Sequence, residues 1–134
     1  MLAATCATSL AVQNSAHAED TPICPKVFPA HVFHPASTTD GWLADTDSPA
    51  PLHSIGIFDG PPDQGALLKP WDSPKDRDTW KLAPPYPQGL WLQCSYGNGA
   101  LTLSRQLPTV PETCVAQYGP LHPGKPRSIS LTCR

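Results

Sequence analysis

Cysteine is the residue type whose number and spacing indicate chemistry most clearly in this chain. Four cysteines follow residue 20, and they are Cys24, Cys94, Cys114 and Cys133. An even number of cysteines in an exported chain is typical of disulfides, and here it predicts two of them. No two of the four have the Cys-x-x-Cys spacing that zinc sites commonly use, so a zinc site is not expected.

The segment between the last two cysteines suggests how the four are paired. Gly119–Pro126 is rich in turn-forming residues, so the segments on either side would return beside each other and place Cys114 near Cys133. Cys24 would then pair with Cys94 and tie the N-terminal segment to the centre of the chain. The main alternative pairs Cys24 with Cys133 and Cys94 with Cys114.

Patterns that indicate catalysis are missing from the sequence. It contains no Gly-x-Ser-x-Gly, no His-Glu-x-x-His, no phosphate-binding loop and no dinucleotide-binding motif. After residue 18 the only glutamates are Glu19 and Glu112, which does not suit the paired carboxylates of a glycosidase. His31 and His34 are three residues apart on an expected strand, so they should point to opposite faces. We therefore expect no catalytic residue, no metal and no cofactor.

The charges are distributed unevenly, although the formal net charge is only −2. Eight aspartates lie between residues 40 and 78 against three basic residues, whereas five basic residues after residue 78 accompany a single glutamate. An acidic half could dock a basic partner protein, but the same run could equally be a solvated, loop-rich surface. The sequence lacks the basic, aromatic patch of a nucleic-acid-binding protein.

We expect a protein partner to contact the proline-rich loops between Pro35 and Gln88. Prolines stiffen these loops and so lower the entropic cost of binding, and tryptophan is a frequent anchor in protein interfaces. The alternative is that the tryptophans cover an open sheet edge, and that binding uses the sheet or its edge. The predicted partner-binding residues are Trp42, Asp45, Asp47, Asp59, Asp63 and Trp71.

The start of the chain has the features of a secretory signal peptide. Residues 1–12 are uncharged and mostly small or apolar, and Ala16-His17-Ala18 is a small-x-small cleavage pattern before the first acidic residues. We therefore predict a signal peptide over residues 1–18, one domain over residues 19–134 and a periplasmic location. No other apolar run is long enough to span a membrane.

Eighteen prolines argue against long helices and favour short strands joined by stiff loops. The predicted fold is all-β and mostly antiparallel, a small single-domain sandwich or open barrel with two disulfides. Long proline-rich loops are expected at Pro35–Pro51 and Gly60–Gln88. The predicted strands are Lys26–Phe33, His53–Asp59, Thr79–Ala83, Leu90–Tyr96, Ala100–Leu107, Thr113–Tyr118 and Arg127–Cys133.

The two central strands form the clearest pattern in the chain. Apolar and polar residues alternate on both sides of Asn98-Gly99, the dipeptide typical of a tight hairpin turn. A two-residue loop at this position sets apolar against apolar and polar against polar residues, whereas a slip by one residue would mix the faces. The predicted pairs are Tyr96 with Leu101, Cys94 with Leu103, Ser95 with Thr102 and Gln93 with Ser104.

Several short motifs resemble a family of small periplasmic proteins of Gram-negative bacteria. The motifs are Ile23-Cys24-Pro25, "WKL", "GLWLQCSYGNGALTLSRQLP", Cys114 and the terminal "ISLTC". Some members of that family are similar in setting to immunity proteins encoded beside type VI secretion effectors that attack peptidoglycan, including effectors that resemble L,D-transpeptidases. The resemblance implies a protein partner and supplies no catalytic residues.

Three hypotheses for the function follow from the sequence and the resemblance. The first is a periplasmic immunity protein that occludes the active site of a peptidoglycan-targeting effector. The second is an inhibitor of host lysozyme, since acidic loops would suit a basic enzyme. The third is a small cell-envelope enzyme, which is disfavoured because no nucleophile and base are paired in the sequence.

Overall fold

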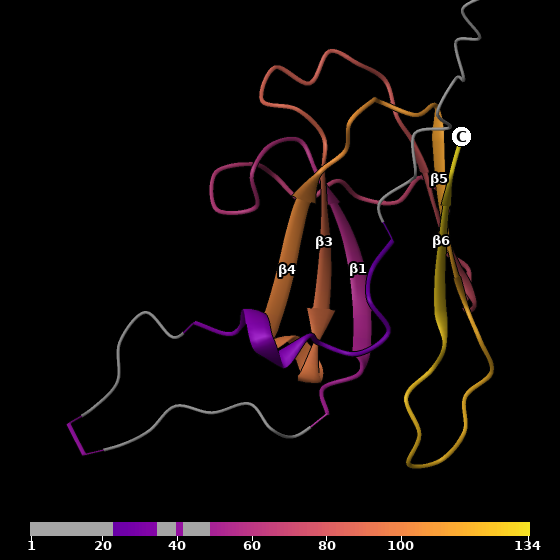
Figure 1. Cartoon of the computed structure of the whole chain (residues 1–134). Helices are drawn as coiled ribbons and strands as arrows, with labels where there is room; N and C mark the ends of the chain where they lie inside the picture. The colour runs from indigo at the N-terminus through magenta and orange to yellow at the C-terminus, as the bar shows by residue number, and fades with distance from the viewer. Residues whose placement is uncertain (1–22, 35–39, 42–48) are drawn as a thin grey trace, which may run out of the picture.

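The computed structural model describes residues 23–34, 40–41 and 49–134, which form an all-β protein (Figure 1). The predicted signal peptide, residues 1–18, lies outside the described residues. Two 3-10 helices, η1 (Ala30–Val32) and η2 (Gly97–Gly99), have three residues each, so no helix in the described ranges has the length and apolar character that a membrane crossing needs. The strands are β1 (Leu52–Phe58), β2 (Arg77–Lys81), β3 (Trp91–Tyr96), β4 (Leu101–Gln106), β5 (Thr113–Tyr118) and β6 (Ile129–Cys133).

The six strands form two antiparallel sheets of three strands. Their orders are β1-β3-β4 and β2-β5-β6, so each sheet combines one strand from earlier in the chain with one later hairpin. The second sheet stands beside β1, and β1 and β6 contact each other (Figure 1). The all-β, antiparallel prediction is confirmed, and the two sheets stay separate and do not close into a barrel.

The β3–β4 hairpin has the register that the alternation predicts, from Tyr96 opposite Leu101 to Trp91 opposite Gln106. Its turn is longer than predicted, because the four residues from 97 to 100 lie between the strands. Asn98 has a φ of 58°, and the glycines on either side also have positive φ, the conformation that glycine and asparagine tolerate best. The face pattern therefore fixes the register, and the local composition allows the turn.

The prediction of a strand at Lys26–Phe33 is wrong. This segment makes one isolated bridge, between Val27 and Pro51, and then turns into η1. Pro29 is the residue that precedes η1, and it lacks the N–H that would continue a strand ladder. His31 lies in η1, so the expected alternation with His34 on a strand does not occur. The other six predicted strands are confirmed with bounds within two residues of the prediction.

Both sheets contribute to one core, together with the N-terminal segment of residues 23–34. The buried side chains include Ile57 and Leu92 from the first sheet and Trp80 and Ala116 from the second. The structure contains the disulfides Cys24–Cys94 and Cys114–Cys133, which is the pairing that the sequence predicts and not its alternative.

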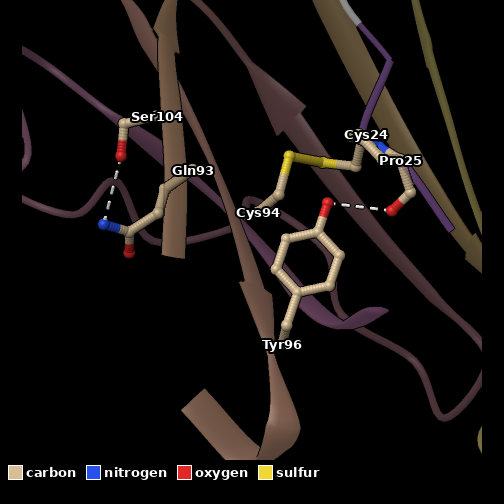
Figure 2. Close-up of a disulfide and its surroundings, with 6 residues drawn as sticks. All are labelled: Cys24, Pro25, Gln93, Cys94, Tyr96 and Ser104. Atoms are coloured by element: carbon tan, nitrogen blue, oxygen red, sulfur yellow. Dashed lines mark hydrogen bonds between the residues drawn. A yellow bond between two sulfur atoms is a disulfide. The ribbon is translucent and has the colours of Figure 1, made fainter. Parts of the chain in front are cut away.

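The N-terminal segment covers one face of the β1-β3-β4 sheet, which we name the inner face. Cys24 is joined to Cys94, and the hydroxyl of Tyr96 donates a hydrogen bond of 2.8 Å to the carbonyl oxygen of Pro25 (Figure 2). Phe28 packs edge-on against Tyr96, with ring centroids 5.5 Å apart. These contacts leave the opposite face of the sheet, the outer face, as the one turned away from the core.

Candidate partner-binding surface

The outer face of the β1-β3-β4 sheet carries uncharged side chains only. Strand alternation and the observed register put three residues of each strand on this face. Gln93 and Ser104 lie on the opposite side of the sheet from Cys94 and Tyr96 (Figure 2). The outer-face residues are Ser54, Gly56, Phe58, Trp91, Gln93, Ser95, Thr102, Ser104 and Gln106.

A loop borders one end of the outer face and forms with it a shallow, open hollow of about 510 Å³. Asp59 holds this loop, because its carboxylate accepts a 2.5 Å hydrogen bond from the backbone N–H of Ala66. Gly60 and Gly65 lie so close that a Cβ on Gly65 would be 2.7 Å from the Gly60 nitrogen. The residues that line the hollow are Pro61, Pro62, Asp63, Trp91, Gln93, Thr102 and Ser104.

The floor of the hollow is held by hydrogen bonds within the sheet and its flanking loop. The indole N–H of Trp91 donates to the carbonyl oxygen of Gln88 at 3.2 Å. The side-chain amide of Gln93 donates to the hydroxyl of Ser104 at 3.5 Å (Figure 2). The hollow therefore combines an oriented aromatic ring, neutral hydrogen-bonding groups and the carboxylate of Asp63.

The structure places three of the predicted partner-binding residues, and it does not bring them together. Asp63 is exposed and lines the hollow, whereas the carboxylate of Asp59 is used to hold the loop. Trp71 is 66% exposed and lies elsewhere, with the ammonium of Lys81 3.4 Å from its ring centroid. The other three predicted residues, Trp42, Asp45 and Asp47, lie outside the described residues.

Trp91 lines this surface but is not among the partner-binding residues predicted from the sequence. The available signal was its place on the polar side of the alternating hairpin, where a large aromatic side chain is unexpected. The sequence pattern does not show that Trp91 lies near Asp63, because the loop and the sheet come together only in the folded chain.

Several aspartates of the acidic half have partners inside the chain. Besides Asp59, Asp72 forms an ion pair with Arg77, whose guanidinium nitrogen is 3.7 Å from the carboxylate. The carboxylate of Asp78 accepts hydrogen bonds from Ser73 and from Tyr118. The aspartates are therefore less of a continuous acidic surface than their number in the sequence suggests.

The second sheet carries a different kind of surface, which is charged and tied together by hydrogen bonds. The hydroxyl of Tyr118 donates to Asp78 at 2.5 Å, and the guanidinium carbon of Arg127 lies 5.3 Å from the Tyr118 ring centroid. Burial, followed by the hydrogen bond and the charge of Asp78, raises the pKa of Tyr118 above its usual value of 10.0. These contacts join β5 to β2 and to the segment before β6.

A disulfide-linked β scaffold with an uncharged, partly aromatic sheet face belongs to the class of small protein-binding domains, because charges are depleted and aromatic residues enriched at the centres of interfaces. The profile of the family described as "Type VI secretion system Tli immunity protein" matches residues 46–134, which include all six strands. The chain therefore belongs to this family of type VI immunity proteins. No curated protein and no solved structure shows a significant match to the chain.

Membership of this family confirms the resemblance seen in the motifs. An immunity protein acts on a protein partner, the effector, and as an inhibitor its role is binding. The candidate site is consequently a surface for a protein, and the hollow beside Trp91 lies on the uncharged face of the first sheet.

Proposed function

We propose that this protein is a periplasmic immunity protein that neutralises a peptidoglycan-targeting type VI effector by covering the effector's active site. The observation that carries the proposal is the family match over residues 46–134. The two disulfides support the periplasmic location, because disulfides form and persist in oxidising compartments.

The scaffold suits inhibition because two elements of the proposed surface, the N-terminal segment and the loop beside the outer face, are held in place before the partner arrives. The N-terminal segment is held on the sheet by a disulfide, and the loop over the outer face is held by Asp59. A preordered surface loses little conformational entropy on binding, so more of the contact energy appears as affinity. An inhibitor of this kind blocks an active site by occupying its entrance and needs no chemistry of its own.

The proposed binding residues include the exposed residues among those predicted from the sequence. Asp63 would attract a basic rim around the effector's active site, and Trp71 would add an aromatic anchor. Trp42, Asp45 and Asp47 stay candidates in the stretch outside the described residues. Asp59 contributes indirectly, since it fixes the loop that carries Asp63.

The experiment is a titration of the purified effector encoded by the adjacent gene with this chain, on two substrates. Isolated peptidoglycan sacculi and phospholipid vesicles represent the wall and the membrane that a toxin in the periplasm can reach. We expect cleavage of sacculi alone, and its complete inhibition at one equivalent of the immunity protein. Lysozyme on the same sacculi is the control, and its activity should not change.

The outcomes separate the parts of the proposal. Cleavage of vesicles instead of sacculi, still blocked by the chain, would keep the immunity role and reject the peptidoglycan target. Binding without inhibition would reject occlusion of the active site. Inhibition of lysozyme with no effect on the effector would instead support the lysozyme hypothesis.

A further inference from the structure

The outer edge of β4 is uncovered in the part of the chain that the structure describes. β4 ends the sheet order β1-β3-β4, and no described strand pairs with its outer side. The backbone N–H of Leu107 donates to the carbonyl of the opposite residue, Leu90, at 2.8 Å. Because such pairs alternate in an antiparallel ladder, the backbone groups of Thr102, Ser104 and Gln106 point away from β3.

The edges of β1 and β2 are occupied by other segments of the chain. The backbone N–H of Leu68 donates to the carbonyl of Ile57, which covers part of the outer side of β1. Thr79 of β2 exchanges backbone hydrogen bonds with Asp72. β6 lies against β1 of the other sheet, although no backbone hydrogen bond joins the two strands in the described residues. Proteins generally cover exposed strand edges because they invite pairing, so an edge left open is notable.

Two hollows lie on the two sides of the β4 edge, and Ser104 lines both of them. The outer one is the hollow beside Trp91. The inner one has a volume of about 270 Å³ and a mostly apolar lining. The residues that line the inner hollow are Ile23, Pro25, Leu92, Cys94, Leu103, Ser104 and Arg105.

We propose that β4 binds an extended segment of the effector as an added strand, in the order β1-β3-β4-effector. The proposal rests on the immunity function and specifies how the partner is held. Successive side chains of a strand point to opposite faces, so a single added strand would place its side chains alternately in the two hollows. The backbone hydrogen bonds would supply affinity and the hollows specificity, as in other cases of strand addition.

The charges at the two hollows define the chemistry of the segment. Asp63 is the only charged residue that lines the outer hollow, and Arg105 is the only one that lines the inner hollow. A matching segment carries a lysine or arginine that passes over Trp91 to Asp63. On the inner side it carries an apolar residue and, two positions along the strand, an acidic residue that meets Arg105. A second copy of β4 would not match, because its sequence, Leu-Thr-Leu-Ser-Arg-Gln, offers Arg105 no acidic partner.

The test compares Ser104→Pro with Ser104→Ala in binding to the purified effector from the adjacent gene. Proline removes the outward N–H of residue 104, which β3 does not use, whereas alanine removes only the hydroxyl and keeps the N–H. We expect Ser104→Pro to weaken binding about tenfold or more, and Ser104→Ala, which loses only the hydroxyl that lines the hollows, to weaken it by a clearly smaller factor. Arg105→Glu, which leaves the backbone unchanged, should also weaken binding and keep the melting temperature.

The result that overturns the proposal is wild-type affinity in both Ser104→Pro and Arg105→Glu. The Arg105→Glu arm decides the matter if Ser104→Pro lowers the melting temperature strongly. A wild-type dimer that Ser104→Pro converts into a monomer would identify a second copy as the occupant and would also overturn the proposal. If wild-type protein fails to bind the effector at all, the immunity proposal itself fails, which is a different result from an unchanged variant.

Discussion

The two sheets of this protein are built to the same plan and differ in what fastens them. Each joins one early strand to a later hairpin, and each contains one disulfide. In the second sheet the disulfide links Cys114 and Cys133, which lie opposite each other on β5 and β6 and are 19 residues apart in sequence. In the first sheet it links β3 to a non-strand segment 70 residues away. One disulfide therefore reinforces a hairpin, while the other holds a separate piece of chain over the core.

This difference has a consequence for the surfaces. The second sheet carries the ion pair of Asp72 with Arg77 and the hydrogen bonds that Asp78 accepts from Ser73 and Tyr118. The first sheet has its inner face covered by the N-terminal segment and keeps an uncharged outer face and the β4 edge open. We therefore expect both sheets to contribute to stability and the first sheet to hold the proposed binding surface.

Removal of either disulfide should give the largest loss of stability among these variants. The two losses should also rank the disulfides of the two sheets by their contribution to the free energy of unfolding. In the chain-entropy model, losing Cys24–Cys94 costs about 4 kcal/mol and losing Cys114–Cys133 about 3 kcal/mol. The measurement is denaturant unfolding of the two double serine variants. The first variant should also lose more, because the segment that covers Tyr96 is released. A larger loss in the Cys114–Cys133 variant would contradict this ranking.

Two tyrosine variants compare a partly buried hydrogen bond in each sheet. Tyr96→Phe removes the donor of the Pro25 carbonyl; the Tyr96 ring is buried but Pro25 is exposed, so the loss should cost about 1 kcal/mol. Tyr118→Phe removes a bond to Asp78 in a partly exposed place and should cost about 1 kcal/mol. Both values follow from the free energy of unfolding at pH 7. Equal wild-type stability of Tyr96→Phe would show that the N-terminal segment is held by the disulfide alone.

Alkaline pH should weaken both sheets, with a measurable share from Tyr118. Folding raises the pKa of Tyr118 and of Tyr96 above 10.0, so the folded state keeps protons that the unfolded chain releases. The stability contributed by these tyrosines is therefore complete below pH 10 and falls above it, as the tyrosines of the unfolded chain lose their protons first. Denaturant unfolding from pH 8.5 to 11 should show a shallower fall in Tyr118→Phe. An identical slope in that variant would exclude this contribution.

Paired aspartate variants give the smallest expected effects and separate structure from binding on the loop beside the first sheet. Asp59→Ala should lower the unfolding free energy by about 1 kcal/mol, because the Ala66 N–H loses its acceptor. Asp63→Ala should change stability by less than about 0.5 kcal/mol and slow association with the effector about twofold to threefold at low salt. Stopped-flow association at two salt concentrations measures the second effect. An unchanged association rate and salt dependence in Asp63→Ala would show that the charge of Asp63 does not contribute to binding.

The sequence predicted those parts of the fold that local patterns determine. The alternation around Asn98-Gly99 predicts the register of β3 and β4 because a one-residue slip would set Cys94 against Thr102 and mix the two faces. It did not predict the end of the strand pattern at Pro29, since the surrounding residues have ordinary strand character. The pairing of β1 with β3 is a tertiary property, and so is the position of the Asp63 loop over Trp91. Because these contacts form only in the folded chain, the sequence could place the candidate binding site only within the proline-rich loops.

Amide hydrogen exchange in the free protein and in its complex with the effector tests the central claim that the first sheet holds the partner. The account predicts that the amides of Thr102, Ser104 and Gln106 exchange rapidly in the free protein and gain protection in the complex. The amides of Ile129 and Leu131 on β6 should be unchanged; they point away from β5, because Arg134 and Thr113 exchange backbone hydrogen bonds and such pairs alternate along the ladder. Protection gained on β6, with none at Thr102, Ser104 and Gln106, would contradict the account.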